Sequence, residues 1–303
     1  MVSILIPVFN YDCSLLIANL IQQGDALKAK EDFDYEIILA DDHSTQQDTI
    51  KKNISILSSC KQGIYLSQNA QQGRARNRNT AIKIAKGEYL IFIDCDAQIH
   101  DNHFLENYWN ARHFASIIVG GIINPASSPK GCELRFKYEK RAEKFRTLKY
   151  RKENPYAHFS TFNFMAKREI LSNIMFSQDI TEYGYEDTLL GCELLKRKIS
   201  IVHIENPLIH LGINSNKDFL KATEAAMRNL YKLPMLHSSV GPSHTANIIE
   251  KFRLKQLFTF FFSILRKPIQ RNLLSHHPSL LLFNIYKVGY YCLQSAPKSS
   301  KLK

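Results

Sequence analysis

The amino-acid sequence predicts an α/β fold, in which helices flank a mostly parallel, Rossmann-like central sheet. Short apolar runs alternate with helical stretches over residues 1–96, and strands that alternate with helices form βαβ units. Three of the apolar runs lead into polar loops that contain Asn or Asp. The composition, with 45% hydrophobic and 22% charged residues among 303, is that of a globular protein and excludes a disordered or low-complexity chain.

Four apolar runs in the first half predict strands. Residues 2–8 form a compact apolar run, as expected for a strand that is covered on both faces. The predicted strands are residues 2–8, 35–40, 63–66 and 89–93, and helices are predicted for residues 14–28, for the stretch before residue 63 and for residues 74–85, which Gly87 closes. Ligands of such sheets bind at the carboxyl ends of the strands. The polar loops at these ends are Phe9-Asn10, Asp41-Asp42 and Asp94-Cys95-Asp96.

The second half of the chain is less regular. Strands are predicted for residues 116–123, ending near Gly120-Gly121, for 161–166 and for 199–204, with a helix from about residue 186 to 198. A basic segment, residues 130–152, also favours a helix. We expect the body to end near Pro234 and residues 235–303 to form a basic, partly helical C-terminal extension.

The positive charge is concentrated at one end of the chain. The formal net charge is +12, from 40 Lys and Arg against 28 Asp and Glu. Ten of the basic residues lie in residues 251–303, which contain no Asp or Glu, so 30 basic residues face 28 acidic ones in the first 250. The body is therefore nearly neutral, and its charge does not indicate a nucleic-acid partner.

The cysteines and the N-terminus predict a protein of the reducing cytoplasm. The six cysteines occur singly and form no Cys-x-x-Cys pair, which argues against a zinc ribbon and a secreted disulfide framework. The first residues, MVSILIPVFN, lack the features of a signal peptide. No apolar run is long enough to span a membrane. We expect a cytoplasmic location, peripheral on the inner face of the cell membrane if the C-terminal extension binds lipid.

Two carboxylates, Asp94 and Asp96, directly follow the predicted strand 89–93. Oxygen ligands of this kind bind divalent cations such as Mg2+ or Mn2+, and a cation there would neutralise a diphosphate leaving group. One carboxylate would bind the cation directly, while the other would act through water or bind a ribose hydroxyl. Taken alone, the motif fits a solvated aspartate pair equally well, because short Asp-x-Asp matches are common by chance.

The aspartate pair is the last of five elements in a fixed order. They are Ile6-Pro7-Val8-Phe9-Asn10, then Ala40-Asp41-Asp42-His43-Ser44, then Asn69 with Gly73-Arg74-Ala75 and Arg78-Asn79, then Ala85-Lys86-Gly87-Glu88-Tyr89, and Asp94-Cys95-Asp96. In order and spacing, residues 3–96 resemble the nucleotide-sugar-binding half of glycosyltransferase family 2, which has the GT-A fold. The sequence departs from that pattern at Phe9, where Tyr is usual, and at His43, where Gly is common.

The resemblance divides the chain and implies roles for its donor half. Residues 1–97 would bind the nucleotide sugar and residues 98–234 the acceptor, which together make the catalytic domain 1–234. Pro7 and Phe9 would flank the uracil or the ribose. Asp41 would accept a hydrogen bond from the imide of the base, and Asp42 would support that loop.

The same resemblance implies a diphosphate and metal site. Gly73 and Arg78 would lie near the base and the diphosphate, to which an Arg side chain binds well. Asp94 would contact the ribose or, through water, the metal, and Asp96 would bind the metal directly. A salt bridge on a helix surface is the structural alternative for Arg78.

A second acidic motif, Glu186-Asp187, opens the predicted helix and follows Tyr183-Gly184-Tyr185. The first turn of a helix favours acidic residues, so a structural role is one interpretation. The motif resembles the Glu-Asp pair of the acceptor half of the same family. By that resemblance Asp187 would be the general base that deprotonates the acceptor hydroxyl, and Glu186 would orient the acceptor, although the assignment of the base between the two stays open.

A late histidine completes the predicted metal site. In many enzymes of this fold such a residue contributes to the metal or the diphosphate, and His210 has the best position after the strand 199–204. There are two alternatives: His203 contributes to the metal or diphosphate site instead, or the histidine only satisfies local hydrogen bonds.

Two basic regions suggest acceptor or surface contacts. In residues 130–152, Arg135, Lys137, Lys140, Arg141 and Lys144 would meet a phosphate-bearing acceptor, or would pair along a helix with Glu133, Glu139 and Glu143. In the C-terminal extension, aromatic residues at 258–262 adjoin Arg266, Lys267 and Arg271, as in helices that lie on anionic lipid. The alternative is a helix that packs on the body or on a second subunit.

Together these patterns predict an inverting, metal-dependent glycosyltransferase of the hexosyl or N-acetylhexosaminyl class. It would use Mn2+ or Mg2+ and a UDP-linked donor, and would glycosylate a hydroxyl of a glycan or lipid-linked acceptor in cell-surface polysaccharide synthesis. The alternative is a basic protein that binds nucleic acid or a membrane surface without catalysis. No nucleic acid is expected as a partner, because RNP, helix-turn-helix and zinc motifs are missing. The first strand is followed by neither Gly-x-Gly-x-x-Gly nor a basic Gly-rich loop, which argues against an oxidoreductase and a nucleotidyltransferase.

Overall fold

A computed structural model describes residues 1–178, 184–237 and 240–294. The chain forms two compact units. The first comprises Met1–Pro125, Glu143–Thr181 and Glu186–Gly212, and the second comprises Ala126–Ala142, Glu182–Tyr185 and Ile213–Lys303. These units are defined by contacts between residues, whereas the predicted domains are defined by their function. The predicted end of the catalytic domain near Pro234 therefore stays a prediction.

The first unit is built on a seven-stranded sheet with the order β3-β2-β1-β4-β8-β6-β9. Its strands are β1 (Val2–Val8), β2 (Tyr35–Asp41), β3 (Gly63–Ser67), β4 (Tyr89–Ile93), β6 (Ile117–Val119), β8 (Asn163–Lys167) and β9 (Ile201–His203). Only β8 runs antiparallel to its neighbours β4 and β6. The predicted α/β class with a mostly parallel sheet is confirmed.

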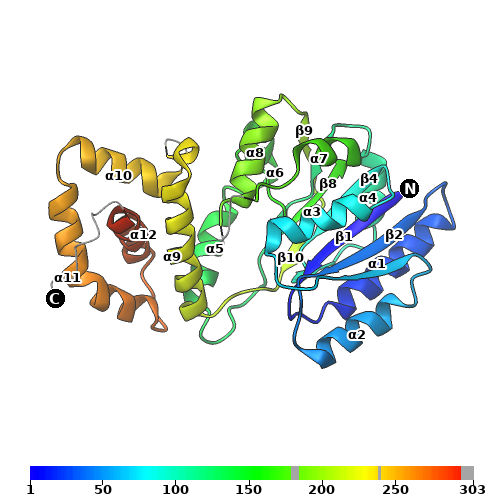
Figure 1. Ribbon diagram of the computed structural model, residues 1–303, viewed down its shortest axis with the longest axis horizontal. Coiled ribbons are helices and arrows are strands. Elements are labelled where there is room, and N and C mark those ends of the chain that lie inside the picture. Colours follow the sequence, from blue (N-terminus) through cyan, green and yellow to red (C-terminus); the bar gives the residue numbers. More distant parts are fainter. Residues whose placement is uncertain (179–183, 238–239, 295–303) are drawn as a thin grey trace. The chain divides into compact units, whose positions relative to one another are not determined.

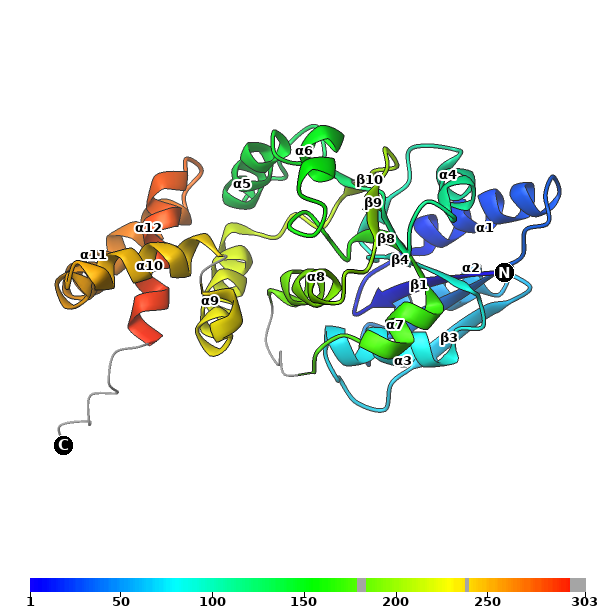
Figure 2. The ribbon, with the colours of Figure 1, turned by 90° about the horizontal axis from the view of Figure 1, so that it is seen from above.

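Helices cover both faces of this sheet (Figures 1 and 2). They are α1 (Ser14–Lys28), α2 (Gln47–Leu57), α3 (Arg74–Ile84), α4 (Phe104–Ala111), α6 (Leu148–Glu153), α7 (Arg168–Ile174) and α8 (Glu186–Lys196). Alternate residues of each central strand enter two separate cores, because successive side chains point to opposite faces. In β4, Ile91 packs with α1 and α4, whereas Leu90 and Phe92 pack with α3, α7 and α8. The strands are therefore apolar on both faces, as the continuous run of β1 predicts.

The order of strands creates a switch point between β1 and β4. The chain moves from β1 outward to β2 and β3, then returns to place β4 on the other side of β1. Loops diverge at such a point and leave a crevice at the carboxyl ends of the strands. The loops after β1, β2 and β4 carry Phe9, Asp42, Asp94 and Asp96, and Gly73 caps α3 after β3, so the topology gathers these predicted residues at one edge.

The prediction of one strand over residues 116–123 is wrong, because two glycines divide it into β6 and β7 (Ile122–Ile123). Gly121 has a φ of +107°, which favours glycine and turns the chain. At Gly120 a Cβ would lie 2.5 to 2.6 Å from Asn163, Asn206 and Tyr108, so only glycine fits. The turn sends β7 into a second, three-stranded sheet with the order β5-β10-β7.

This small sheet positions His210. Its other strands are β5 (Ala97–Gln98) and β10 (Leu208–His210), which pair antiparallel so that His210 lies opposite Ala97. Because β5 begins one residue after Asp96, the pairing places the last residue of β10 next to the aspartate motif. His210 therefore ends a strand rather than following one.

The second unit is helical. It contains α5 (Glu133–Glu143), α9 (Asn216–Lys232), a short 3-10 helix (Pro234–Leu236), α10 (Gly241–Lys251), α11 (Lys255–Leu273) and α12 (Leu280–Gln294). The core comprises Leu134, Phe219, Leu220, Phe262, Ile269, Leu273, Phe283 and Tyr286. Figure 1 shows α12 almost end-on, between α9, α10 and α11. The predicted partly helical extension is confirmed for its described residues, which leave out Lys298, Lys301 and Lys303.

The basic segment 130–152 forms two helices, α5 and α6, rather than one. On α5, Arg135 pairs with Glu139 at 2.6 Å and lies over the Phe219 ring, 4.7 Å from its centroid. This is the pairing along the helix that the structural alternative describes. Within the described parts of the chain, no helix combines the length and the apolar character needed to cross a membrane.

Candidate active site

The loops after β1 and β2 are fastened to one another. In the parallel register, Val8 lies opposite Asp41. The backbone N–H of Asn10 donates to Ser44 Oγ at 2.8 Å, and Asn10 Oδ1 accepts from the backbone N–H groups of Thr45 and Gln46. These bonds hold Phe9, which is 42% exposed, at the carboxyl edge of the sheet with its ring open to solvent.

Asp41 and Asp42 are both buried, and the carboxylate of each accepts two hydrogen bonds. Asp41 accepts from the backbone N–H of Ser44 at 2.7 Å and from the hydroxyl of Tyr65. Asp42 accepts from the backbone N–H groups of Gln72 at 2.7 Å and Gly73 at 2.9 Å. Asp41 thus lies beside Tyr65, and Asp42 ties the β2 loop to the start of α3.

Tyr65 was not among the predicted site residues. Burial and its hydrogen bond to Asp41 raise the pKa of the Tyr65 phenol, so the hydroxyl stays protonated and donates. It lies in β3, where the sequence shows only an apolar run, and its pairing with Asp41 arises from the register of β2 and β3. Pro7 lies in β1 opposite Ala40, within the predicted strand 2–8, and its contact with the base or ribose stays a prediction.

Asp94 is joined to Arg78 at 2.6 Å. The Arg78 side chain is only 3% exposed, and its guanidinium lies 5.5 Å from the centroid of the Phe176 ring. Burial raises the pKa of Asp94, and the charges of Arg78 and Arg74 oppose that effect. Because Arg78 is buried, the alternative of a salt bridge on a helix surface does not describe it.

Asp96 is joined to His210, with Asp96 Oδ2 3.2 Å from His210 Nε2. The ring of Phe162 packs edge-on against the imidazole, with the centroids 5.2 Å apart. Burial raises the pKa of Asp96, but its hydrogen bond to His210 and the charges of His210 and Arg74 outweigh burial, so the pKa lies below its ordinary value. Asp96 is therefore held as a carboxylate.

Two buried atoms of this pair have no hydrogen-bond partner among the described residues: Asp96 Oδ1 and His210 Nδ1. A buried polar atom without a partner is costly, and a bound ligand removes that cost. A carboxylate oxygen and an imidazole nitrogen fit Mn2+, whereas Mg2+ prefers oxygen ligands throughout. Within the described residues no three His, Cys, Asp or Glu side chains converge, so a cation here would need further ligands from a substrate phosphate.

The alternative histidine, His203, is already engaged. Its Nε2 lies 2.9 Å from the carbonyl oxygen of Pro155, and its Nδ1 lies 3.3 Å from Arg151 Nη1. Burial lowers the pKa of His203 to about 4, so the ring is neutral, donates to Pro155 and accepts from Arg151. The geometry therefore favours His210 of the two.

The acidic motif of α8 lies near the aspartates of β4. Asp187 accepts from Thr161 Oγ1 at 2.6 Å, from the Thr161 backbone N–H at 3.2 Å and from Ser160 Oγ at 3.2 Å. Phe162, the next residue, accepts from the backbone N–H of Asp94 at 3.0 Å. This short path through Thr161 and Phe162 connects Asp187 with Asp94, and Tyr183, part of the predicted motif, lies outside the described residues.

Glu186 and Arg74 add charge to the same cluster. Burial raises the pKa of Glu186, and the charge of Asp187 acts in the same direction, while Arg74 and Arg78 oppose them. Arg74 also acts on Asp94 and Asp96. Arg74 was not predicted as a site residue, although it is the first residue of α3, where the helix dipole also attracts anions.

Gly212 is a further residue that the sequence did not reveal. A Cβ at this position would lie 1.8 Å from Asp96 Oδ2, so a larger residue would displace the carboxylate. The backbone N–H of the preceding residue, Leu211, donates to the Asp96 carbonyl oxygen at 2.8 Å. Residues 210 to 212 therefore enclose Asp96 from one side.

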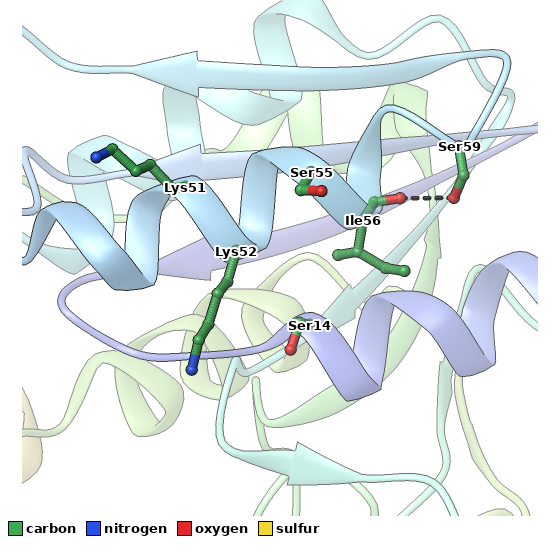
Figure 3. Close-up of a pocket in the computed structure, with 6 residues that line it drawn as sticks. All are labelled: Ser14, Lys51, Lys52, Ser55, Ile56 and Ser59. Atoms are coloured by element: carbon green, nitrogen blue, oxygen red, sulfur yellow. Dashed lines mark hydrogen bonds between the residues drawn. The ribbon is translucent and has the colours of Figure 1, made fainter.

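A separate cleft of about 480 Å³ lies between α1 and α2 (Figure 3). Its lining residues are Ser14, Lys51, Lys52, Ser55, Ile56 and Ser59. None of them is a predicted site residue. Lys52 is paired with Asp12 at 3.2 Å, so part of the positive charge there is already compensated.

Comparison with known proteins places the chain in a family. Residues 3–175 match the family described as Glycosyl transferase family 2. A poly(ribitol-phosphate) beta-glucosyltransferase of Bacillus spizizenii is 34% identical over 139 residues, which are 43% of this chain and 20% of that protein. A GalNAc(5)-diNAcBac-PP-undecaprenol beta-1,3-glucosyltransferase of Campylobacter jejuni is 28% identical over 211 residues, which are 66% of this chain and 62% of that protein. The matches thus span a fifth to about three fifths of these relatives.

The fold is that of a solved glycosyltransferase. The mannosyltransferase PcManGT from Pyrobaculum calidifontis, in complex with GDP-Man and Mn2+, superposes with a TM-score of 0.53, and the match covers 96% of this chain and 84% of that one at 13% identity. The family match covers more than half of the residues of this chain. The chain therefore belongs to glycosyl transferase family 2 and has the GT-A fold.

Proposed function

We propose that this protein is an inverting, metal-dependent glycosyltransferase that moves a hexosyl or N-acetylhexosaminyl group from a UDP-sugar to a hydroxyl. The observation that carries the proposal is the cluster of Asp94, Asp96, Glu186 and Asp187 around Arg74 and Arg78. Carboxylates that bind a cation and a ribose, beside arginines that bind phosphate, fit a nucleotide sugar.

The donor would occupy the crevice at the carboxyl ends of β1, β2 and β4. The exposed Phe9 ring offers a stacking surface for the base, and Asp41 retains acceptor capacity for its imide N–H. Arg74, at the N-terminus of α3, would bind the diphosphate. This assignment keeps the negative diphosphate at the positive end of a helix.

Asp96, through its unpartnered Oδ1, and His210, through the Nε2 that lies 3.2 Å from Asp96 Oδ2, would hold a divalent cation. When bound, the cation would neutralise charge that develops on the departing diphosphate. Asp94, paired with Arg78, would bind a ribose hydroxyl. The site is thus built for a leaving group that carries a nucleoside diphosphate.

Asp187 would act as the general base. It would accept the proton of the acceptor hydroxyl while the hydroxyl oxygen forms a bond to the anomeric carbon and the bond from that carbon to the diphosphate oxygen breaks, which inverts the configuration. Ser160 and Thr161 fix the carboxylate, and Glu186 would orient the acceptor. The three donors from Ser160 and Thr161 fix the orientation of the Asp187 carboxylate.

The acceptor would be a polymer or a lipid-linked glycan of the cell surface. The two relatives support this class, because one is named for poly(ribitol phosphate) and the other for an undecaprenol-linked glycan. Poly(ribitol phosphate) and a glycan on undecaprenol diphosphate both offer free hydroxyl groups. We propose that the enzyme acts on such acceptors in polysaccharide synthesis.

A donor screen tests the proposal. Thermal shift and donor hydrolysis are measured with UDP-glucose, UDP-N-acetylglucosamine and GDP-mannose, each with Mn2+, with Mg2+ and with EDTA. We expect stabilisation by a UDP-sugar that requires the metal, and then transfer to poly(ribitol phosphate) or to an undecaprenyl-linked glycan. Stabilisation by none of the nucleotides in the presence of metal would contradict the proposal, and stabilisation by GDP-mannose alone would overturn the UDP assignment.

A further inference from the structure

The helix α11 presents an apolar face to solvent. Together with the turn before it, this face comprises Phe252, Leu254, Leu257, Phe260, Phe261, Ile264 and Leu265, whose exposed fractions lie between 50% and 66%. The last five recur with the spacing of one helix face. We call these seven residues the α11 face. Single exposed apolar residues are normal, but five on one face of a helix, with two more in the turn before it, mark an interaction surface.

The exposure of the α11 face does not result from a poorly packed helix. On its opposite side, Phe262, Ile269 and Leu273 are buried in the core of the second unit. Arg266 also points inward, with its guanidinium 3.5 Å from Glu224 and 5.1 Å from the centroid of the Tyr290 ring. The helix is thus anchored on one side and apolar on the other, where a helix exposed to water normally carries polar residues.

Cations border the α11 face. Arg253 precedes the helix, and Lys267 and Arg271 follow the apolar row, and all three are exposed. Arg271 lies fourteen residues after Leu257, about four helical turns, and therefore on the same side of the helix. Residues 251–303 contain no Asp or Glu, so no acidic side chain of that segment interrupts the positive border.

We propose that the α11 face lies on an anionic membrane surface, with its apolar side chains among the lipid chains and its cations at the phosphate headgroups. Apolar aromatic residues beside cations are the combination that binds helices in the plane of anionic lipid. A second copy of the chain fits less well, because a two-fold contact through this face brings like charges together. Nucleic acid would satisfy the cations but would leave seven apolar side chains in water.

Vesicle cosedimentation tests the inference without donor or acceptor, and therefore independently of the proposed transfer. The full chain is incubated with phosphatidylcholine vesicles that contain or lack phosphatidylglycerol, at low and high salt. We expect binding to the anionic vesicles that weakens at high salt, since charges near a surface are screened. Equal binding to both kinds of vesicle, or binding to neither, would overturn the proposal.

Two variants separate the apolar and the charged contributions. Phe260→Ser with Phe261→Ser should weaken binding to anionic vesicles at least tenfold, and Lys267→Gln with Arg271→Gln should remove the preference for anionic lipid. The matched control is Leu15→Ser with Phe114→Ser, since both residues are 66% exposed on the first unit. Binding that this control weakens as much as the α11 variants would contradict the assignment to α11.

Two other occupants of the α11 face are outcomes of the same study. Light scattering that shows a dimer, which Phe260→Ser with Phe261→Ser converts to a monomer, without vesicle binding, would assign the face to a second copy. Retention of a single-stranded oligonucleotide that depends on Lys267 and Arg271 but not on Phe260 and Phe261, without vesicle binding, would assign it to nucleic acid. Either result would overturn the membrane proposal.

Discussion

At the scale of single residues, substitution of Asp96 tests the proposed metal site most directly. Asp96→Asn keeps the shape of the side chain but removes its charge, and the amide oxygen can still accept from His210. We expect transfer to fall by roughly 100-fold or more, equal to about 2.7 kcal/mol of the barrier. We also expect Mn2+ no longer to increase the thermal stabilisation by UDP. Retained metal dependence would contradict the role of Asp96, and Asp32→Asn, at an exposed position, is the control.

Thr161 positions the proposed base, because it donates twice to Asp187 and is itself buried. Thr161→Val keeps the size of the side chain and removes the hydroxyl donor. We expect kcat to fall by roughly 10- to 100-fold while KM for the donor changes little, since loss of an oriented group affects the transition state. Thr161→Ser should restore most of the rate. A purely structural role would instead lower the melting temperature and leave kcat of the folded protein intact.

Gly212 protects the position of Asp96. In Gly212→Ala, the new methyl group would lie 1.8 Å from Asp96 Oδ2 unless the carboxylate moves. We expect the affinity for Mn2+ in the presence of UDP to fall at least tenfold, with circular dichroism unchanged. Gly241→Ala is the matched control, because a Cβ there meets nothing within 4 Å. Unchanged metal affinity in Gly212→Ala would show that Asp96 is not held in place by this contact.

These residues show where sequence reasoning ends. Asp94 and Asp96 could be predicted because they directly follow the apolar run of β4. Their position at the carboxyl end of that strand follows from the sequence alone. Tyr65, Thr161 and Gly212 lie in ordinary apolar or loop contexts, and each gains its role from a residue at least 24 positions away. Their contribution depends on strand register and loop packing, which local patterns do not encode.

At the scale of elements, apolar runs of five residues or more were predicted well, and short strands were not. β1 and β4 have the predicted bounds because both are continuous apolar runs. β5 and β10 have two and three residues, too few for a periodic pattern. Glycine decides the break between β6 and β7, where Gly121 requires a positive φ and Gly120 has no space for a side chain.

One element of the second unit contains a lysine whose burial is costly. Lys287 of α12 lies with its Nζ 5.0 Å from the Tyr138 ring centroid and 4.9 Å from that of Phe283. Burial lowers the pKa of Lys287 from 10.5 to about 8. A lowered lysine pKa means that the folded state disfavours the charge, so the cost is full below pH 8 and vanishes as pH rises to 10.5.

Lys287→Met should therefore stabilise the protein at neutral pH. We expect a gain in the free energy of unfolding on the order of 1–3 kcal/mol at pH 7, reduced by the lost cation–π contacts, and a smaller gain at pH 10. Guanidinium titrations at both pH values measure the difference from the parent chain. Lys221→Met, at an exposed position of α9, is the control and should change little. A gain that is equal at both pH values would contradict burial of the charge as the cause.

At the scale of the whole molecule, the charge and the chemistry lie in different places. All the predicted site residues from Pro7 to His210 belong to the first unit, whereas residues 251–303, which carry ten basic residues and no acidic ones, belong to the second. The total of +12 describes neither part. The uneven distribution of charge could be predicted from the sequence. The place of residues 126–142 in the second unit could not, because it depends on packing against residues that are distant in sequence.

Two compact units with separate cores should respond separately to ligand and to mutation. UDP with Mn2+ binds, by our proposal, only to the first unit, and at about 100 times Kd it would stabilise that unit by about 2.7 kcal/mol. Lys287→Met acts only in the core of the second. We therefore expect differential scanning calorimetry to show two transitions, one raised by the ligand and the other by the substitution. A single transition that both changes raise would mean that the two units unfold as one cooperative body.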